Sequence, residues 1–435
     1  MIQKIARLVF ILGVSLVALG CASAAIQETE TEPAATAETT EVVVESCDAS
    51  EDWVTNPENA PAEVSMGENA QICQFHQFSW QWFINLLSES STGVRAYEDQ
   101  ENYPLLLGND DSCTATGVDR QLFVRVEKDN DGPEDDFILP ERIDQADGSI
   151  VYDQKGNIIY YEVRFSREYC SLDPSVQMFP PDVTELKVSW RVITEAEKSS
   201  YIWINADIDN NGTIEPAEIL GMVGFHLVKS TPLHPEFIWA TFEHKQNAPE
   251  CQTAPSTTEG WSFTSAACAA QLPASVNPTP CPFNGPTNPP TPVPVTNGPE
   301  SEVCRVYHAG SKPGDNQYDT NVAAIDQLNA QLTGPNGFIT ALPASNPLAI
   351  LQNYVLVGAL WEDDVTQPST NTANQRGSIQ LANTTMETTT QQGYLVPYTG
   401  PTSSNATNCF GCHNYTPGSN AGISHIFKEI HGPSN

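Results

Sequence analysis

The chain has 435 residues, with 19 lysines and arginines against 54 aspartates and glutamates, which gives a formal net charge of −35. This acidity argues against nucleic-acid binding and against docking on anionic lipid, because both need clustered cations. Hydrophobic residues make up 40% of the chain, which is enough for a sizeable core, and the length favours two or three domains.

The N-terminal segment is typical of an export signal. Two cations precede an apolar run, residues 8–19, that is too short for an ordinary transmembrane helix. Cys21 ends a stretch that resembles a bacterial lipobox, which predicts its lipidation; cleavage after Ala24 is the alternative. We therefore expect export, either as a lipoprotein on the periplasmic side of a bacterial membrane or as a soluble periplasmic or secreted protein. A lipid anchor at Cys21 would be the only membrane attachment.

Cysteine usage agrees with an oxidising compartment. Of 11 cysteines, Cys21 is lipidated or removed, and Cys409 and Cys412 belong to a motif discussed below. The remaining eight predict disulfides, about four, and leave their pairing open. These eight are Cys47, Cys73, Cys113, Cys170, Cys251, Cys268, Cys281 and Cys304.

Hydrophobic periodicity predicts a helix followed by a sheet. Residues 71–89 carry apolar side chains at helical spacing, and we interpret His76 among them as a core histidine. Residues 185–192 alternate with period two, which predicts a strand with one dry face and one wet face carrying Glu185 and Arg191. Further predicted elements are a hairpin at 149–165, strands at 219–228 and 237–242, a helix at 319–332 and an apolar stretch at 354–361.

These elements favour an α+β, β-rich fold: an antiparallel sheet or sandwich body with a mostly irregular or helical C-terminal segment. Residues 272–300 are rich in proline, which predicts an extended loop that Cys281 pins to the body. The expected organisation is a signal peptide at 1–20, an acidic tether at 21–46, a disulfide-rich β body at 47–304 and a C-terminal segment at 305–435.

Residues 207–218 match the 12-residue EF-hand calcium loop, with oxygen-bearing ligands at the diagnostic positions and a glycine, Gly212, at the sharp turn. The predicted Ca²⁺ ligands are Asp207, Asp209, Asn211, Thr213 through its carbonyl, Glu215 and Glu218. A capping box at 194–197 would start an entering helix on which Trp203 packs. A calcium loop inserted into a sheet hairpin is equally consistent with the flanking sequence. A similar stretch at 129–136 has proline where the closing glutamate belongs and is interpreted as an acidic turn.

Cys409-Phe410-Gly411-Cys412-His413 contains the Cys-x-x-Cys-His pattern of c-type haem attachment. At this spacing both thiols reach one edge of a porphyrin, and the adjacent histidine reaches the iron. Residues 305–435 are therefore the predicted haem c segment, a mostly irregular or helical haem-binding segment. A thioredoxin-like redox pair or a structural zinc pair is the alternative, but the motif lies in a segment rich in Gly and Asn, and no second Cys-x-x-Cys exists.

The second axial ligand of the iron is left open. His425 follows His413 across a loop with proline and glycine, and its ligation would lower the potential relative to methionine. Met386 lies upstream of the motif and is the alternative. His308 and His431 are weaker candidates, and an open sixth position also fits.

The C-terminal region resembles a single-haem bacterial c-type cytochrome site. Residues 78–83, 234–244 and 381–387 resemble segments of a group of exported bacterial proteins that carry one such motif. The resemblance implies one cytochrome-like unit and names no substrate. The chain departs from small cytochromes because its motif is near the C-terminus and no methionine follows it.

The sequence is consistent with three alternative functions. The first is an exported cytochrome with one covalent haem c, structural Ca²⁺ and a redox partner protein, in which the acidic surface either meets a basic partner or serves solubility. The second is a haem enzyme of peroxidase or oxygenase type with an open sixth position, in which His425, His308 or Glu387 serves as the acid–base group. The third is a haem-free, disulfide-rich calcium-binding module.

Overall fold

The structure is a computed structural model, and its described residues begin at Ser46. They are residues 46–65, 71–107, 110–115, 122–124, 150–208, 211–273, 281–285, 287, 293–315, 317–388, 391, 408–411 and 413–431. The predicted signal peptide, Cys21, nearly all of the tether and the acidic turn at 129–136 lie outside the described residues.

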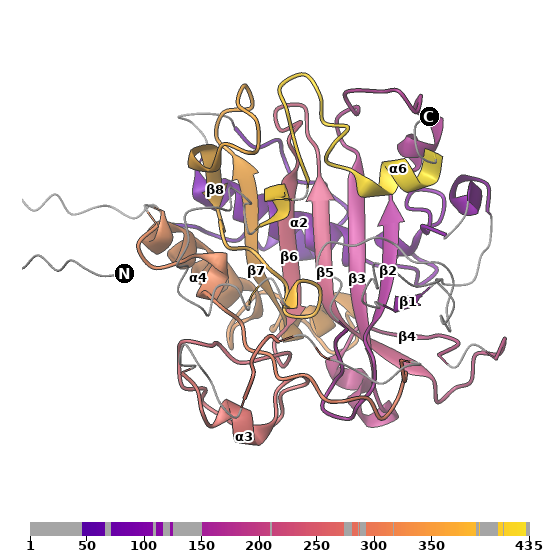
Figure 1. The fold of residues 1–435 in the computed structure, drawn as a ribbon, viewed down its shortest axis with the longest axis vertical. Coiled ribbons are helices and arrows are strands. Elements are labelled where there is room, and N and C mark those ends of the chain that lie inside the picture. The colour runs from indigo at the N-terminus through magenta and orange to yellow at the C-terminus, as the bar shows by residue number, and fades with distance from the viewer. Residues whose placement is uncertain are drawn as a thin grey trace, which may run out of the picture. The chain divides into compact units, whose positions relative to one another are not determined.

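The described part of the chain folds around an antiparallel sheet, which confirms the β-rich α+β fold (Figure 1). Its strand order is β1-β2-β3-β5-β6-β7-β8, and β4 pairs with β5 beside this path. The strands are β1 (Phe123–Val124), β2 (Tyr160–Phe165), β3 (Thr184–Val192), β4 (Trp203–Asn205), β5 (Ile219–Lys229), β6 (Ile238–His244), β7 (Tyr354–Glu362) and β8 (Gln375–Gly377). Strand β7 lies beyond residue 304 yet pairs with β6, so the predicted β body and the predicted haem c segment share one sheet.

Among the described residues, two helices have 16 residues and confirm the predicted helices at 71–89 and 319–332, while the other helices are short. The α-helices are α1 (Asp52–Thr55), α2 (Ile72–Leu87), α3 (Ala266–Ala269), α4 (Tyr318–Thr333) and α6 (His425–His431). The 3₁₀ helices span Ala96–Glu98, Asp110–Cys113, Arg167–Ser171, Glu195–Ser200, His308–Gly310, Pro347–Asn353, Thr372–Asn374 and Cys409–Gly411.

One face of the sheet packs against α2, which lies behind the strands in Figure 1. The apolar residues of α2 recur at helical spacing, so they form one stripe that the sheet buries. Phe83 stacks on Phe242 of β6 with ring centroids 3.8 Å apart. His76 is fully buried and hydrogen-bonds Asn321 of α4 at 2.7 Å, in agreement with its interpretation as a core histidine.

The other face of the sheet is also buried, so the predicted wet face of β3 is wrong. Glu185, Ser189 and Arg191 are all under 9% exposed. The chain returns over this face after β8, and its C-terminal part lies in front of the strands in Figure 1. Ser189 Oγ contacts Thr385 Oγ1 at 2.7 Å. Gly224 permits this approach, because a Cβ at that position would lie 2.8 Å from the same threonine oxygen.

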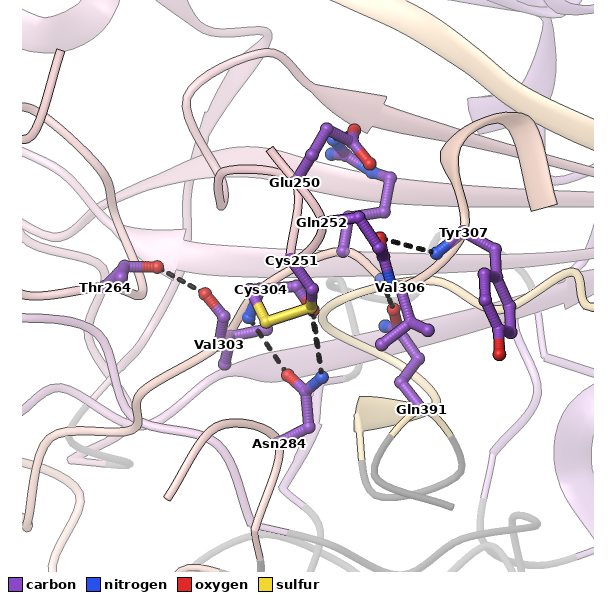
Figure 2. Close-up of a disulfide and its surroundings, with 11 residues drawn as sticks. Glu250, Cys251, Gln252, Thr264, Asn284, Val303, Cys304, Val306, Tyr307 and Gln391 are labelled. Carbon is purple, nitrogen blue, oxygen red and sulfur yellow. Dashed lines mark hydrogen bonds and ion pairs between the residues drawn. A yellow bond between two sulfur atoms is a disulfide. The ribbon is translucent and has the colours of Figure 1, made fainter. Parts of the chain in front are cut away.

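The eight cysteines between residues 47 and 304 form four disulfides, as their number predicts. The pairs are Cys47–Cys73, Cys113–Cys170, Cys251–Cys304 and Cys268–Cys281. Figure 2 shows Cys251–Cys304, where the Asn284 amide donates to the Cys304 carbonyl at 2.9 Å. Cys281 pins the proline-rich loop to the body as expected. Among the described residues, none of the helices is long and apolar enough to cross a membrane.

Candidate functional site

The Cys-x-x-Cys-His motif lies against the face of the sheet that the C-terminal segment covers. Cys409 opens a 3₁₀ helix and belongs to none of the four disulfides, whereas Cys412 lies outside the described residues. Phe410 is buried, and its ring meets Trp239 of β6 edge-on, with centroids 6.0 Å apart. The cysteine-bearing turn is therefore anchored to the sheet through its middle residue.

His413 is held in a defined orientation by its surroundings. Its Nδ1 lies 2.6 Å from the carbonyl oxygen of Ile423, and its ring centroid is 4.6 Å from that of Trp239. Burial, with a smaller contribution from His425, lowers the pKa of His413 to about 4, so the ring is neutral at pH 7. Because a carbonyl only accepts, Nδ1 carries the proton and Nε2 carries the lone pair. Metal-binding histidines share this pattern, so His413 fits the role of an iron ligand.

His425 is the first residue of α6, and its ring stacks on that of His413. The centroids are 4.4 Å apart and the ring planes differ by 25°. Two imidazoles on opposite sides of one iron do not stack, so His425 lies beside His413 and not across from it. Its service as a sixth ligand requires a shift of the start of α6.

The other candidate ligands lie in different surroundings. Met386 is fully buried in a cluster with Tyr161 and Val223. His308 bonds Asp326 at 2.7 Å, and this bond and a second carboxylate raise its pKa to about 10. His431 lies 2.9 Å from the Tyr169 carbonyl oxygen. Of these candidates, only His425 is in ring contact with His413 in the part of the chain that the structure describes.

A polar row crosses the sheet near His413. Lys187 of β3 pairs in register with His226 of β5, which pairs with Thr241 of β6. His226 Nε2 lies 2.8 Å from an oxygen of Glu387, and both Lys187 and Glu387 influence the pKa of His413. The sequence predicts Glu387 as a candidate acid–base group. It does not predict that Lys187, His226 and Thr241 lie side by side, because only the register of β3, β5 and β6 brings them together.

Asn420 fixes the loop between His413 and His425. It is fully buried, its Oδ1 accepts from the Phe179 amide at 2.6 Å, and its Nδ2 donates to the Pro235 carbonyl at 3.0 Å. One side chain thus ties the motif's loop to two loops distant in sequence. No periodic signal in the sequence marks this asparagine.

Two buried carboxyl groups lie at the end of β6 and β7. Glu236 and Glu362 are 0% and 1% exposed. Burial, with a smaller contribution from Glu236, raises the pKa of Glu362 to about 8. Burial, with smaller contributions from both carboxyls, raises the pKa of Tyr415, which follows the motif closely. The site therefore has a protonatable group near it at neutral pH.

Residues 207–218, predicted as a calcium loop, connect β4 to β5, so the segment lies between two paired strands and not between two helices. Asp207 accepts from the amides of Asn211 and Gly212, at 3.0 and 2.7 Å. Gly212 has a φ of +86°, the conformation that a sharp turn requires. Glu218 folds back to accept from the Ile208 amide at 2.8 Å, which brings the two ends of the loop together.

The remaining predicted calcium ligands divide into two groups. Asn211, Thr213 and Glu215 lie within the loop, whereas Asp209 falls outside the described part of the chain. Within the described part, no group of three or more His, Cys, Asp or Glu residues is arranged to hold a metal ion. Two features of the loop therefore suit Ca²⁺: the sharp turn at Gly212 and the position of the Glu218 carboxylate beside the start of the loop.

The capping box at 194–197 is confirmed, but it starts the 3₁₀ helix Glu195–Ser200. Trp203 opens β4 and is 44% exposed, and its ring contacts Lys198 of this 3₁₀ helix, whose Nζ lies 3.8 Å from the ring centroid. It therefore meets the capped element through one side chain and is not buried on an entering α-helix.

Comparison with known proteins adds no relative, because no protein family, curated protein or solved structure matches this chain.

Proposed function

We propose that the chain is an exported c-type cytochrome that carries one haem attached through Cys409 and Cys412, with His413 as an iron ligand. The observation that supports this most strongly is the His413 imidazole, which is neutral and held by the Ile423 carbonyl. Haem bound there would supply a one-electron redox centre.

The residues around the motif suit a covalently held apolar group. Trp239 and Phe410 supply aromatic surface beside His413, and Ile423 fixes its ring. Fixing the tautomer raises the basicity of the ligand nitrogen and keeps it aimed in one direction. His425 would supply the second iron ligand after a shift of the start of α6, because its ring now stacks on that of His413. Met386 is the alternative ligand.

Export and partners form part of the same proposal. Four disulfides are compatible with an exported protein, and a lipid anchor at Cys21 would hold it at a bacterial membrane on the periplasmic side. The acidic tether would then separate the sheet from the lipid. The electron-transfer partner is a protein, and the net charge of −35 favours a basic one.

A second candidate function, a haem enzyme with an open sixth position, is favoured by the His226–Glu387 pair. A histidine hydrogen-bonded to a carboxylate at 2.8 Å is a suitable proton donor and acceptor. This pair replaces His308, which bonds Asp326 and Glu250 away from the motif. Spin state separates this function from electron transfer.

Calcium has a structural role in the proposal. Loop 207–218 joins two neighbouring strands, so Ca²⁺ held by Asp207 and Glu218 would stiffen the β4–β5 connection. Extracellular loops of this class bind Ca²⁺ with a Kd of about 10⁻⁴–10⁻³ M, which suits a permanently filled site.

The test is haem staining of denatured protein that has been matured in a periplasm with c-type haem assembly. The parent chain should stain, and the C409A/C412A variant should not. The C268S/C281S variant is the matched control, because it removes two cysteines that form a disulfide of the loop region. Absence of stain in the parent chain would refute the cytochrome and leave the haem-free module.

A further inference from the structure

A cleft separate from the motif opens beside β4. Its volume is about 460 Å³, and three segments form its walls: residues 89–98, 198–203 and 344–352. In Figure 1, β4 lies at the opposite end of the sheet from α6. The cleft therefore belongs to neither the motif nor the proposed iron ligands.

Trp203 gives the cleft an exposed aromatic wall. The residue is 44% exposed, which is unusual for so large an apolar side chain. Lys198 Nζ lies 3.8 Å from the ring centroid, so the ammonium ion covers one face of the indole. The opposite face of the indole is available for an apolar face of a ligand.

The lining of the cleft carries two cations and two carboxylates, Glu89 and Glu98. Arg95 bonds Glu89 at 2.9 Å, and Lys198 bonds Glu195, which lies outside the lining, at 2.8 Å. Glu98 accepts from the Arg95 amide and from the Tyr97 hydroxyl. Arg95 also donates to the Leu87 carbonyl. A phosphate or a metal cation would have to break these pairs, and the separated charges would lose their partners. The charge balance therefore favours an uncharged ligand.

The remaining wall offers neutral polar groups. Asn346, Gln352 and Ser199 line the cleft and supply amide and hydroxyl donors and acceptors. An uncharged ligand that suits both these groups and an indole has an apolar C–H face and a rim of hydroxyls. A pyranose ring has both. We propose that this cleft binds a neutral saccharide, with Trp203 as the stacking platform.

The test is calorimetric titration of the haem-loaded full chain with four neutral oligosaccharides: cellohexaose, chitohexaose, maltohexaose and laminarihexaose. At least one should bind saturably, and Trp203→Ala should weaken it by at least about tenfold. Gln352→Ala removes an exposed amide of the wall and should also weaken binding. Leu233→Ala is the matched control, since Leu233 is 40% exposed and does not line the cleft.

Three outcomes would overturn the proposal. The first is that none of the four oligosaccharides binds. The second is that a sugar binds equally well to the parent chain, Trp203→Ala and Gln352→Ala, which would place it elsewhere. The third is that inorganic phosphate binds and is displaced by none of the sugars, with its binding lost in Arg95→Gln. Thermal melts of each variant check that the fold is retained.

Discussion

The imidazole rings of His413 and His425 stack with their centroids 4.4 Å apart. This contact brings the last residue of the Cys-x-x-Cys-His motif and the first residue of α6 together. The spacing of His413 and His425 in the sequence does not predict this contact. Met386, the other candidate ligand, lies in a separate buried cluster.

The first prediction concerns the sixth ligand. In the haem-loaded protein, His425→Ala should convert a low-spin spectrum to a high-spin spectrum that binds added cyanide or imidazole, because it removes the proposed second ligand. Met386→Leu should leave the spin state unchanged, because it keeps a buried apolar side chain of similar size in a separate cluster. Absorption spectra of both variants make the comparison. If Met386→Leu gives the high-spin form and His425→Ala does not, the assignment is reversed.

Periodicity predicted the elements well but not what covers them. The α2 helix and strands β3, β5 and β6 follow from apolar spacing, because one face of each is buried in the same core. The polar face of β3 reads as exposed because alternation reports polarity and not what packs on it. The covering segment lies far along the chain, and Ser189 meets Thr385 only in the folded protein.

The residues of the candidate site that belong to a motif of fixed spacing could be predicted from the sequence. The residues that only the pairing of neighbouring strands brings together could not. Cys409, Cys412 and His413 follow from spacing alone. Trp239 and His226 belong to different strands, and only the pairing of β5 with β6 places them on one surface. The glycines and proline of the loop after His413 likewise do not predict that the Asn420 side chain bonds to two other loops, at Phe179 and Pro235.

The second prediction concerns calcium. Glu218→Gln should weaken Ca²⁺ binding by about tenfold or more, because it replaces the charged closing ligand with an amide. The parent protein should gain about 2.7 kcal/mol of stability at a Ca²⁺ concentration 100 times Kd. Thermal melts with Ca²⁺ and with EDTA measure this. Glu58→Gln, at an exposed position outside the loop, is the control, and equal calcium shifts in both variants would reject the site.

The third prediction concerns the pH dependence of stability. Burial raises the pKa of Glu362 to about 8, so the folded chain binds this proton more tightly than the unfolded chain does. The contribution of Glu362 to the free energy of unfolding is therefore fully present below about pH 4.5 and falls as pH rises toward 8. Glu362→Gln should flatten this part of the profile and be more stable than the parent above pH 8.

Urea unfolding at a series of pH values measures the effect of Glu362→Gln. Glu58→Gln again serves as the control, because it removes a carboxyl at an exposed position. If Glu362→Gln leaves the slope between pH 5 and 8 unchanged, the buried carboxyl is not the source of the pH dependence.

The fourth prediction concerns the core between α2 and the sheet. Phe83 is fully buried and stacks on Phe242 at 3.8 Å, so Phe83→Ala leaves a cavity where two aromatic faces met. It should lower the free energy of unfolding by about 3–5 kcal/mol. Denaturant unfolding measures the change. Leu233→Ala, which truncates an exposed side chain, should cost under about 0.5 kcal/mol.

The measurement that tests the central claim most directly is the mass of the peptide containing residues 408–413, isolated from protein matured with c-type haem assembly. The cytochrome proposal predicts that this peptide carries one covalent haem, with both cysteine sulfurs alkylated by the porphyrin. Recovery of the peptide without haem, with its cysteines as thiols or joined in a disulfide, would contradict it.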